Sequence, residues 1–127
     1  MRYQNIFHID DDEDDAEIFL SAALEASNAV TIEGFYDARK ALDKLVGLQI
    51  LPDAIFLDLN MPIMDGFEFL RELRSSTAFQ NIPVIILSTS SHQDTIDATK
   101  KLGADGFITK PSDYNQLVTI LRSYLMQ

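Results

Sequence analysis

The chain has 127 residues, of which 46% are hydrophobic and 24% charged, so its composition is that of one globular domain and not of a disordered segment. It contains no cysteine, which excludes disulfides, thiolate metal sites and thiol nucleophiles. Twenty acidic residues against ten basic ones give a net charge of −10, so direct binding to nucleic acid or to an anionic membrane is not expected.

Short apolar segments alternate with segments of helical periodicity along the whole chain. Strands are predicted over residues 5–9, 30–36, 54–57, 83–87 and 106–109. Helices are predicted over residues 14–26, 37–48, 66–75, 94–102 and 114–125. In the first helix Ile18 shares its apolar side with Phe19, and the fourth helix has only a thin apolar stripe. Strands that alternate with helices predict a parallel sheet covered on both faces.

An acidic block follows the first predicted strand, because seven of the twenty acidic residues lie within positions 10–17. Carboxylates favour the start of a helix, which explains the later members of the block. Asp10 and Asp11 directly follow the apolar strand, where like charges repel and a divalent cation would relieve them. An EF-hand calcium loop is excluded, since neither possible register supplies its Gly and its final Glu. From this block alone, a solvated helix start and a metal site both stay open.

Polar residues also end the third, fourth and fifth predicted strands, at Asp58, Ser88 and Lys110. The carboxyl ends of parallel strands lie at one edge of a sheet, and ligands of open α/β sheets bind there. Each residue alone is typical of a helix cap or a turn. Three carboxylates, a hydroxyl and an ammonium group at one edge indicate a functional site.

These residues resemble those of the receiver domain of two-component response regulators, along essentially the whole chain, residues 1–127. The resemblance rests on Asp10–Asp11, the run DLNMPIMDG from Asp58 to Gly66, Ser88 and Lys110–Pro111. The intervals from Asp58 to Ser88 (30 residues) and to Lys110 (52 residues) are typical of that family. The resemblance implies a doubly wound, flavodoxin-like (βα)5 fold with five parallel strands in the order 2-1-3-4-5.

The resemblance also implies a phosphoacceptor site. Asp58 would accept a phosphoryl group from phosphohistidine on a sensor histidine kinase or a histidine phosphotransferase. Mg²⁺ would be bound by Asp11 directly, by Asp10 through water, by Asp58 and by the backbone carbonyl of Asn60. The register of the acidic pair is open at this stage, because Asp11–Asp12 is an alternative to Asp10–Asp11.

The remaining implied roles concern the response to phosphorylation. Lys110 would pair with one phosphoryl oxygen, and the Ser88 hydroxyl would donate to another. Phe107, at a position where many relatives carry Tyr, would change rotamer as part of a switch that also moves the helix over 94–102. The Lys110–Pro111 bond is commonly cis in this family, and a cis bond is expected here.

Other functions are weaker readings of the same residues. A haloacid-dehalogenase-type phosphatase needs a second Asp two residues after its nucleophile, and this chain has Asn60 there. A receiver-like scaffold that never accepts phosphate has no need of clustered acids. We therefore expect a stand-alone receiver, not a turnover enzyme, with no membrane span or signal peptide and a cytoplasmic location. His8 is expected in the core and Asp105 in a turn.

Overall fold

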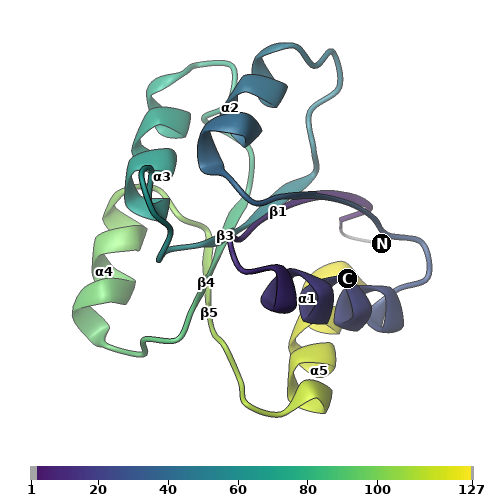
Figure 1. Cartoon of the computed structure of the whole chain (residues 1–127). Coiled ribbons are helices and arrows are strands. Elements are labelled where there is room, and N and C mark those ends of the chain that lie inside the picture. The colour runs from purple at the N-terminus through teal and green to yellow at the C-terminus, as the bar shows by residue number, and fades with distance from the viewer. Residues whose placement is uncertain (1–2, 127) are drawn as a thin grey trace.

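The computed structural model describes residues 3–126, so Met1, Arg2 and Gln127 of the predicted 1–127 domain lie outside the described residues. Every predicted element is present, with ends shifted by at most two residues (Figure 1). The elements are β1 (Asn5–Ile9), α1 (Glu13–Ala26), β2 (Thr31–Phe35), α2 (Ala38–Val46), β3 (Ala54–Asp58), α3 (Gly66–Ser75), β4 (Val84–Ser88), α4 (Gln93–Lys101), β5 (Gly106–Thr109) and α5 (Tyr114–Leu125).

The five strands form one parallel sheet in the order β2-β1-β3-β4-β5, which confirms the predicted doubly wound fold. Helices α2, α3 and α4 lie on one face of the sheet, and α1 and α5 lie on the other (Figure 1). Two apolar clusters follow from this arrangement, one between the sheet and each layer of helices. Strands β3 and β4 are buried at every position because both of their faces are covered.

The two helices next to β5 are held very differently. Helix α5 buries four apolar side chains, those of Leu117, Val118, Leu121 and Leu125. Helix α4 buries only Thr99, whose hydroxyl donates to the carbonyl oxygen of Ile96 at 2.9 Å. The thin apolar stripe predicted for this helix is therefore confirmed, and little apolar area holds α4 on the sheet.

The loop between β3 and α3 closes on itself, because Gly66, the first residue of α3, lies against the backbone of Asp58, the last residue of β3. A Cβ on Gly66 would lie 2.7 Å from the carbonyl oxygen of Asp58, so only glycine lets α3 start beside the end of β3. Asp65 caps α3, since its side chain accepts from the backbone N–H of Glu68 at 2.9 Å. Between these ends, Ile63 has a φ of 67° and is 98% exposed. The left-handed conformation costs a β-branched residue about 1–2 kcal/mol.

The first helix departs from its prediction in one respect. Phe19 is buried as expected, but Ile18 is 47% exposed. The helical period places Ile18 beside the buried stripe, whereas the packing of α1 on α5 leaves this position at the mouth of a cavity. Within residues 3–126, no helix is long and apolar enough to cross a membrane.

Candidate functional site

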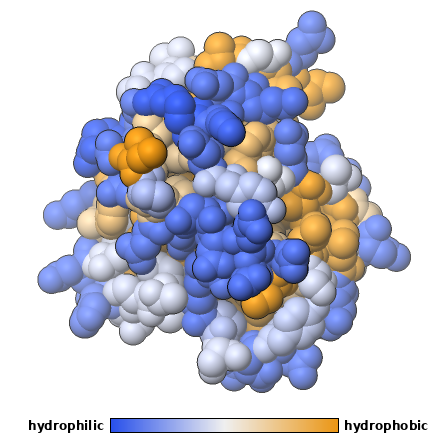
Figure 2. All heavy atoms as spheres, viewed as in Figure 1, coloured by the Kyte–Doolittle hydropathy of each residue, from blue (hydrophilic) through white to orange (hydrophobic). Residues whose placement is uncertain are grey.

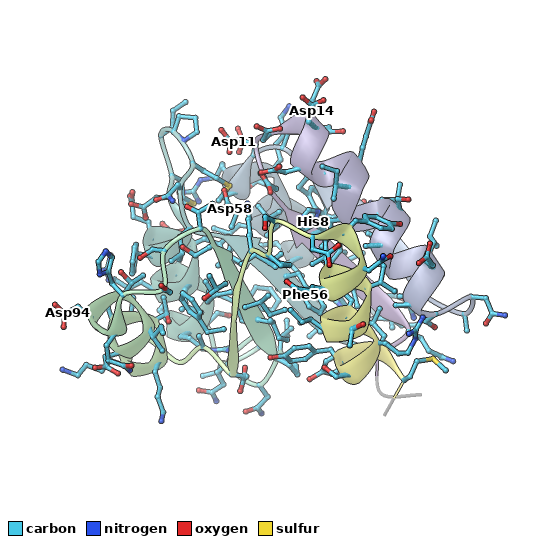
Figure 3. All side chains as sticks on the ribbon, turned by 90° about the horizontal axis from the view of Figure 1, so that it is seen from below. His8, Asp11, Asp14, Phe56, Asp58 and Asp94 are labelled. Atoms are coloured by element: carbon cyan, nitrogen blue, oxygen red, sulfur yellow. The ribbon has the colours of Figure 1, made fainter. Side chains whose placement is uncertain are left out.

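The carboxyl end of the sheet brings together the acidic residues that follow β1 and end β3. One carboxylate oxygen from each of Asp10, Asp11 and Asp58 lies within 4.8 Å of the others. Asp10 and Asp58 are buried, whereas Asp11 is exposed. Figure 3 shows Asp58 below Asp11, with Asp14 farther out on α1. On the surface, hydrophilic side chains gather over the start of α1 (Figure 2).

Lys110 reaches into this cluster from the end of β5. Its Nζ lies 3.2 Å from Asp58 Oδ1 and 3.3 Å from Asp10 Oδ2. It also lies 3.3 Å from Asp15 Oδ2, on the first turn of α1. The backbone N–H of Lys110 donates to the carbonyl oxygen of Ser88 at 2.7 Å, which fixes the start of the side chain beside β4. One ammonium group thus faces three carboxylates.

The expectation of a cis Lys110–Pro111 bond is wrong, because residues 3–126 contain no cis peptide bond. Lys110 reaches Asp58 with a trans bond, since the backbone pairing with Ser88 already carries β5 to the edge of the site.

Burial sets the proton affinities of the cluster. It raises the pKa of Asp10 to about 6, although the N–H of Asp12 and the charge of Lys110 both oppose the rise. Burial also raises the pKa of Asp58, again against the attraction of Lys110. Burial alone would lower the pKa of Lys110, but the charges of Asp10, Asp58 and Asp15 outweigh it, and this pKa is raised. The cost of burying the charged carboxylates of Asp10 and Asp58 is therefore only partly offset by Lys110, and Lys110 itself stays protonated.

The structure separates the two registers of the acidic pair by what each residue binds. Asp12 is the N-cap of α1, because its Oδ1 accepts from the backbone N–H of Asp15 at 3.0 Å. Its own backbone N–H donates to Asp10 Oδ1 at 3.0 Å. Asp12 is therefore used by the helix, while Asp10 and Asp11 face Asp58. Sequence reasoning missed Asp15 as a partner of Lys110, because its place in the first turn of α1 looked like that of an ordinary helix-start carboxylate.

The other predicted site residues surround the cluster. Ser88 is buried at the end of β4, where its hydroxyl oxygen accepts from the backbone N–H of Ser90 at 3.1 Å. Asn60 is exposed in the loop two residues after Asp58. Phe107 lies half-buried on β5, paired in register with Ile86 and packed against the cluster under α2 and α3.

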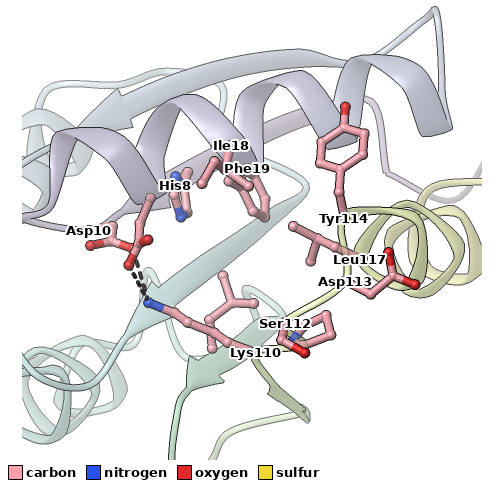
Figure 4. A pocket seen from close by; sticks show the side chains of 12 residues that line it. His8, Asp10, Ile18, Phe19, Lys110, Ser112, Asp113, Tyr114 and Leu117 are labelled. Carbon is pink, nitrogen blue, oxygen red and sulfur yellow. Dashed lines mark hydrogen bonds and ion pairs between the residues drawn. The ribbon is translucent and has the colours of Figure 1, made fainter.

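A cavity of about 340 Å³ opens beside Lys110, between α1 and α5 (Figure 4). Ile18 and Phe19 line it from α1, and Tyr114 and Leu117 line it from α5. His8 forms part of its wall and stacks on Phe19, with ring centroids 3.8 Å apart. Burial and the nearby Lys110 charge lower the pKa of His8 to about 3. His8 is thus a neutral core residue, as predicted.

The acidic cluster fits a hard divalent cation. It offers only oxygen donors, which Mg²⁺ and Mn²⁺ prefer over nitrogen or sulfur. Burial without full compensation raises the pKa of both Asp10 and Asp58, and a bound cation would remove that penalty. Lys110 contributes one positive charge against the three carboxylates of Asp10, Asp11 and Asp58, so the cluster can accept further positive charge from a cation.

Comparison with known proteins gives one consistent result. A family model described as the response regulator receiver domain matches residues 6–122. Response regulator Rre1 of Synechocystis sp. is 32% identical over 115 residues, which cover 91% of this chain and 49% of that protein. The chain spans about half the length of the curated relatives it matches.

Solved structures agree with the sequence matches. The phosphorylated cyanobacterial phytochrome response regulator RcpA is 30% identical, with a TM-score of 0.85 over 95% of this chain and 90% of that one. The Mn²⁺-bound form of response regulator Rcp1 is 25% identical, with a TM-score of 0.81 over 94% of this chain and 90% of that one.

Proposed function

This chain belongs to the response regulator receiver family, and on that premise we propose that it is a phosphoacceptor switch in which Asp58 is the acceptor. An Asp58 carboxylate oxygen attacks the phosphorus of a phosphohistidine on a sensor kinase or histidine phosphotransferase. An O–P bond forms as the P–N bond breaks, and its electron pair stays on the imidazole, which keeps a proton. The product is an acyl phosphate on Asp58.

A single contact carries this proposal, the 3.2 Å between Lys110 Nζ and Asp58 Oδ1. A carboxylate is a weak nucleophile, so the rate must come from positioning and from neutralising charge on the transferred group. Lys110 stands where it holds Asp58 before transfer and faces a phosphoryl oxygen afterwards. Its partners Asp10 and Asp15 keep the ammonium in place and protonated.

Mg²⁺ would be held by Asp10, Asp11, Asp58 and the backbone carbonyl of Asn60, and when bound it supplies positive charge opposite the phosphoryl oxygens. Asp10 and Asp11 would supply carboxylate ligands to the cation, and Lys110, which contacts both Asp10 and Asp58, would supply a second positive charge. The similar response regulator Rcp1 has a Mn²⁺-bound form, which supports the binding of a divalent cation by this chain.

The switch that we propose starts at Ser88. Its hydroxyl oxygen accepts from Ser90 N–H at 3.1 Å, and turning the hydroxyl to donate to a phosphoryl oxygen would release that N–H. The loop after β4 would then move, and with it the weakly held α4. Phe107, half-buried behind α4, would change rotamer as that space changes.

In this proposal the chain catalyses its own phosphorylation and does not turn over separate substrate molecules. A phosphatase of the aspartyl-intermediate class needs an acid two residues after its nucleophile, and Asn60 cannot donate a proton as an acid. We propose one receiver domain over residues 1–127, working with a cytoplasmic kinase domain. Its downstream partner is a protein, because the net charge of −10 opposes direct contact with nucleic acid.

The test is phosphorylation by acetyl phosphate with Mg²⁺, followed by intact-mass measurement. Wild type should gain one acid-stable, base-labile phosphoryl group, and Asp58→Asn should gain none. Lys110→Ala should label at least roughly a hundredfold more slowly, because it loses a preorganised charge. An unlabelled wild type would favour the scaffold reading, and a labelled Asp58→Asn would mean that another residue is the acceptor.

A further inference from the structure

Ile63 is the residue that fits the fold least well. It is 98% exposed, and its φ of 67° is the one positive value at a non-glycine residue within residues 3–126. An exposed isoleucine alone needs no explanation. A β-branched side chain in the left-handed conformation is a different matter, because Asn, Asp or Gly would adopt it at less cost. Neither packing nor backbone geometry selects isoleucine here.

The neighbours of Ile63 fix its unusual backbone. Met61 and Met64 are both buried in the core cluster under α2 and α3. Two buried anchors three residues apart leave the intervening segment, with Pro62, at the surface. Gly66 then joins the loop back to the residue after β3, because its backbone N–H donates to the carbonyl oxygen of Leu59 at 3.0 Å. Ile63 therefore stands on a tip that both ends of the loop hold in place.

That tip lies at the rim of the phosphoacceptor site. Gly66 touches the backbone of Asp58, and Ile63 precedes Gly66 by three residues, so the chain allows at most about 10 Å between them. The Asp58 side chain is 7% exposed. A phosphohistidine can reach it only if the protein that carries the histidine covers the rim. Ile18, exposed on α1, lines the same cavity as Lys110 and is a second exposed apolar residue.

We propose that Ile63 is a specificity-determining contact for the protein that donates the phosphoryl group. Its side chain enters an apolar recess next to the phosphohistidine of that donor. The inference rests on the proposed function, since it requires transfer to Asp58. A small phosphodonor has no surface to meet Ile63, so the residue matters only when the donor is a protein.

The experiment compares two donors on wild type and three variants. A panel of autophosphorylated sensor histidine kinases is screened with wild type, and the fastest donor is used beside acetyl phosphate. Ile63→Asn removes the apolar contact and suits the left-handed backbone, whereas Ile63→Leu keeps an apolar side chain. Ile50→Asn is the matched control, because Ile50 is 82% exposed but lies in the loop before β3, away from the site.

Ile63→Asn should melt roughly 3–6 °C higher than wild type as strain is relieved. It should accept phosphate from the kinase at least tenfold more slowly, while labelling by acetyl phosphate stays unchanged. Ile63→Leu and Ile50→Asn should both keep transfer from the kinase within about twofold of wild type.

Four results would overturn the inference. Equal rates of transfer from the kinase to Ile63→Asn and to wild type would show that the donor does not contact Ile63. A downstream partner would then be the protein that binds this residue. A loss with both donors would mean that Ile63 shapes the acceptor loop itself. If acetyl phosphate labels Asp58 but no kinase does, the donor contact is wrong while the acceptor assignment stands; if neither labels it, the proposed function fails.

Discussion

The two ends of the β-sheet use aspartate in opposite ways. At the amino end, Asp53 accepts from the backbone N–H groups of Gln4 and Asn5 at 2.9 and 2.8 Å. Asp105 accepts from the N–H of Val84 at 2.8 Å, and so joins β5 to β4. At the carboxyl end, Asp10 and Asp58 are buried beside one lysine, and burial raises the pKa of both.

The difference lies in the donors that each carboxylate meets. Backbone N–H groups at the amino end are fixed by the strands, so Asp53 and Asp105 stabilise the sheet whatever is bound elsewhere. At the carboxyl end, the three clustered acids have fewer donors than their oxygens can accept from. Such a cluster gains most when a cation or a phosphoryl group with its cation arrives. The aspartates at the amino end of the sheet therefore stabilise the fold, whereas those at the carboxyl end are available to bind a cation or a phosphoryl group.

The largest expected effect is a gain of stability at the carboxyl end. The pKa of Asp10 is about 6 in the folded protein against 3.8 for the free side chain, so the folded state binds this proton more tightly. The contribution of Asp10 to the free energy of unfolding therefore falls as pH rises from about 4 to about 6, and stays low above that. Asp10→Asn should raise the free energy of unfolding by about 2–3 kcal/mol at pH 8, but hardly at pH 4.

Urea unfolding in the presence of a chelator measures this effect. Asp43→Asn, an exposed change on α2, is the control for the loss of one charge. Equal gains for the two variants at pH 8 would mean that net charge, and not burial of Asp10, destabilises the metal-free protein.

The amino end should respond with the opposite sign. Asp53→Ala removes the acceptor of two backbone N–H groups and should lower the free energy of unfolding by about 2 kcal/mol, less than for a buried site because water replaces part of the bond. Labelling of Asp58 by acetyl phosphate should not change. Asp53→Asn keeps an acceptor oxygen and should recover part of the loss. If Asp53→Ala were more stable than wild type, aspartates at the amino end of the sheet would not stabilise the fold, and the contrast with the carboxyl end would be wrong.

The smallest effect tests which acids bind the cation. Mg²⁺ at ten times its Kd should stabilise wild type by about 1.4 kcal/mol, which is a rise in Tm of roughly 3–7 °C. Asp11→Asn should lose most of this rise. Asp12→Asn should keep it, because Asp12 caps α1 and lies outside the acidic cluster. Thermal unfolding at constant ionic strength separates binding from screening. A response lost in Asp12→Asn and kept in Asp11→Asn would move the acidic pair by one residue.

Local patterns were enough to predict the alternating strands and helices of a parallel sheet, whereas the strand order came from the resemblance to the receiver family. Periodicity and strand-end residues depend on neighbours in sequence, and topology alone then places Asp10, Asp58 and Lys110 at one edge. The register of the acidic block is different, because six consecutive acids give equivalent local signals. The capping bond from Asp15 N–H to Asp12 is a matter of backbone geometry, which composition does not encode.

Long-range packing accounts for what the sequence could not predict. Ile18 has the period of a core residue, but it lines a cavity between α1 and α5 and stays 47% exposed. The left-handed backbone of Ile63 follows from the burial of Met61 and Met64, which depends on α2 and α3 as much as on the loop.

The weak attachment of α4 has a consequence for when its amide protons exchange with solvent. Opening α4 exposes only one buried side chain, that of Thr99, whereas opening α5 exposes four. The amides of Gln93–Lys101 should therefore exchange through a local opening, at a free energy well below that of global unfolding, while those of α5 report the whole molecule. A change of only a few kcal/mol can therefore shift the local opening equilibrium of α4 without shifting the global unfolding equilibrium that α5 reports.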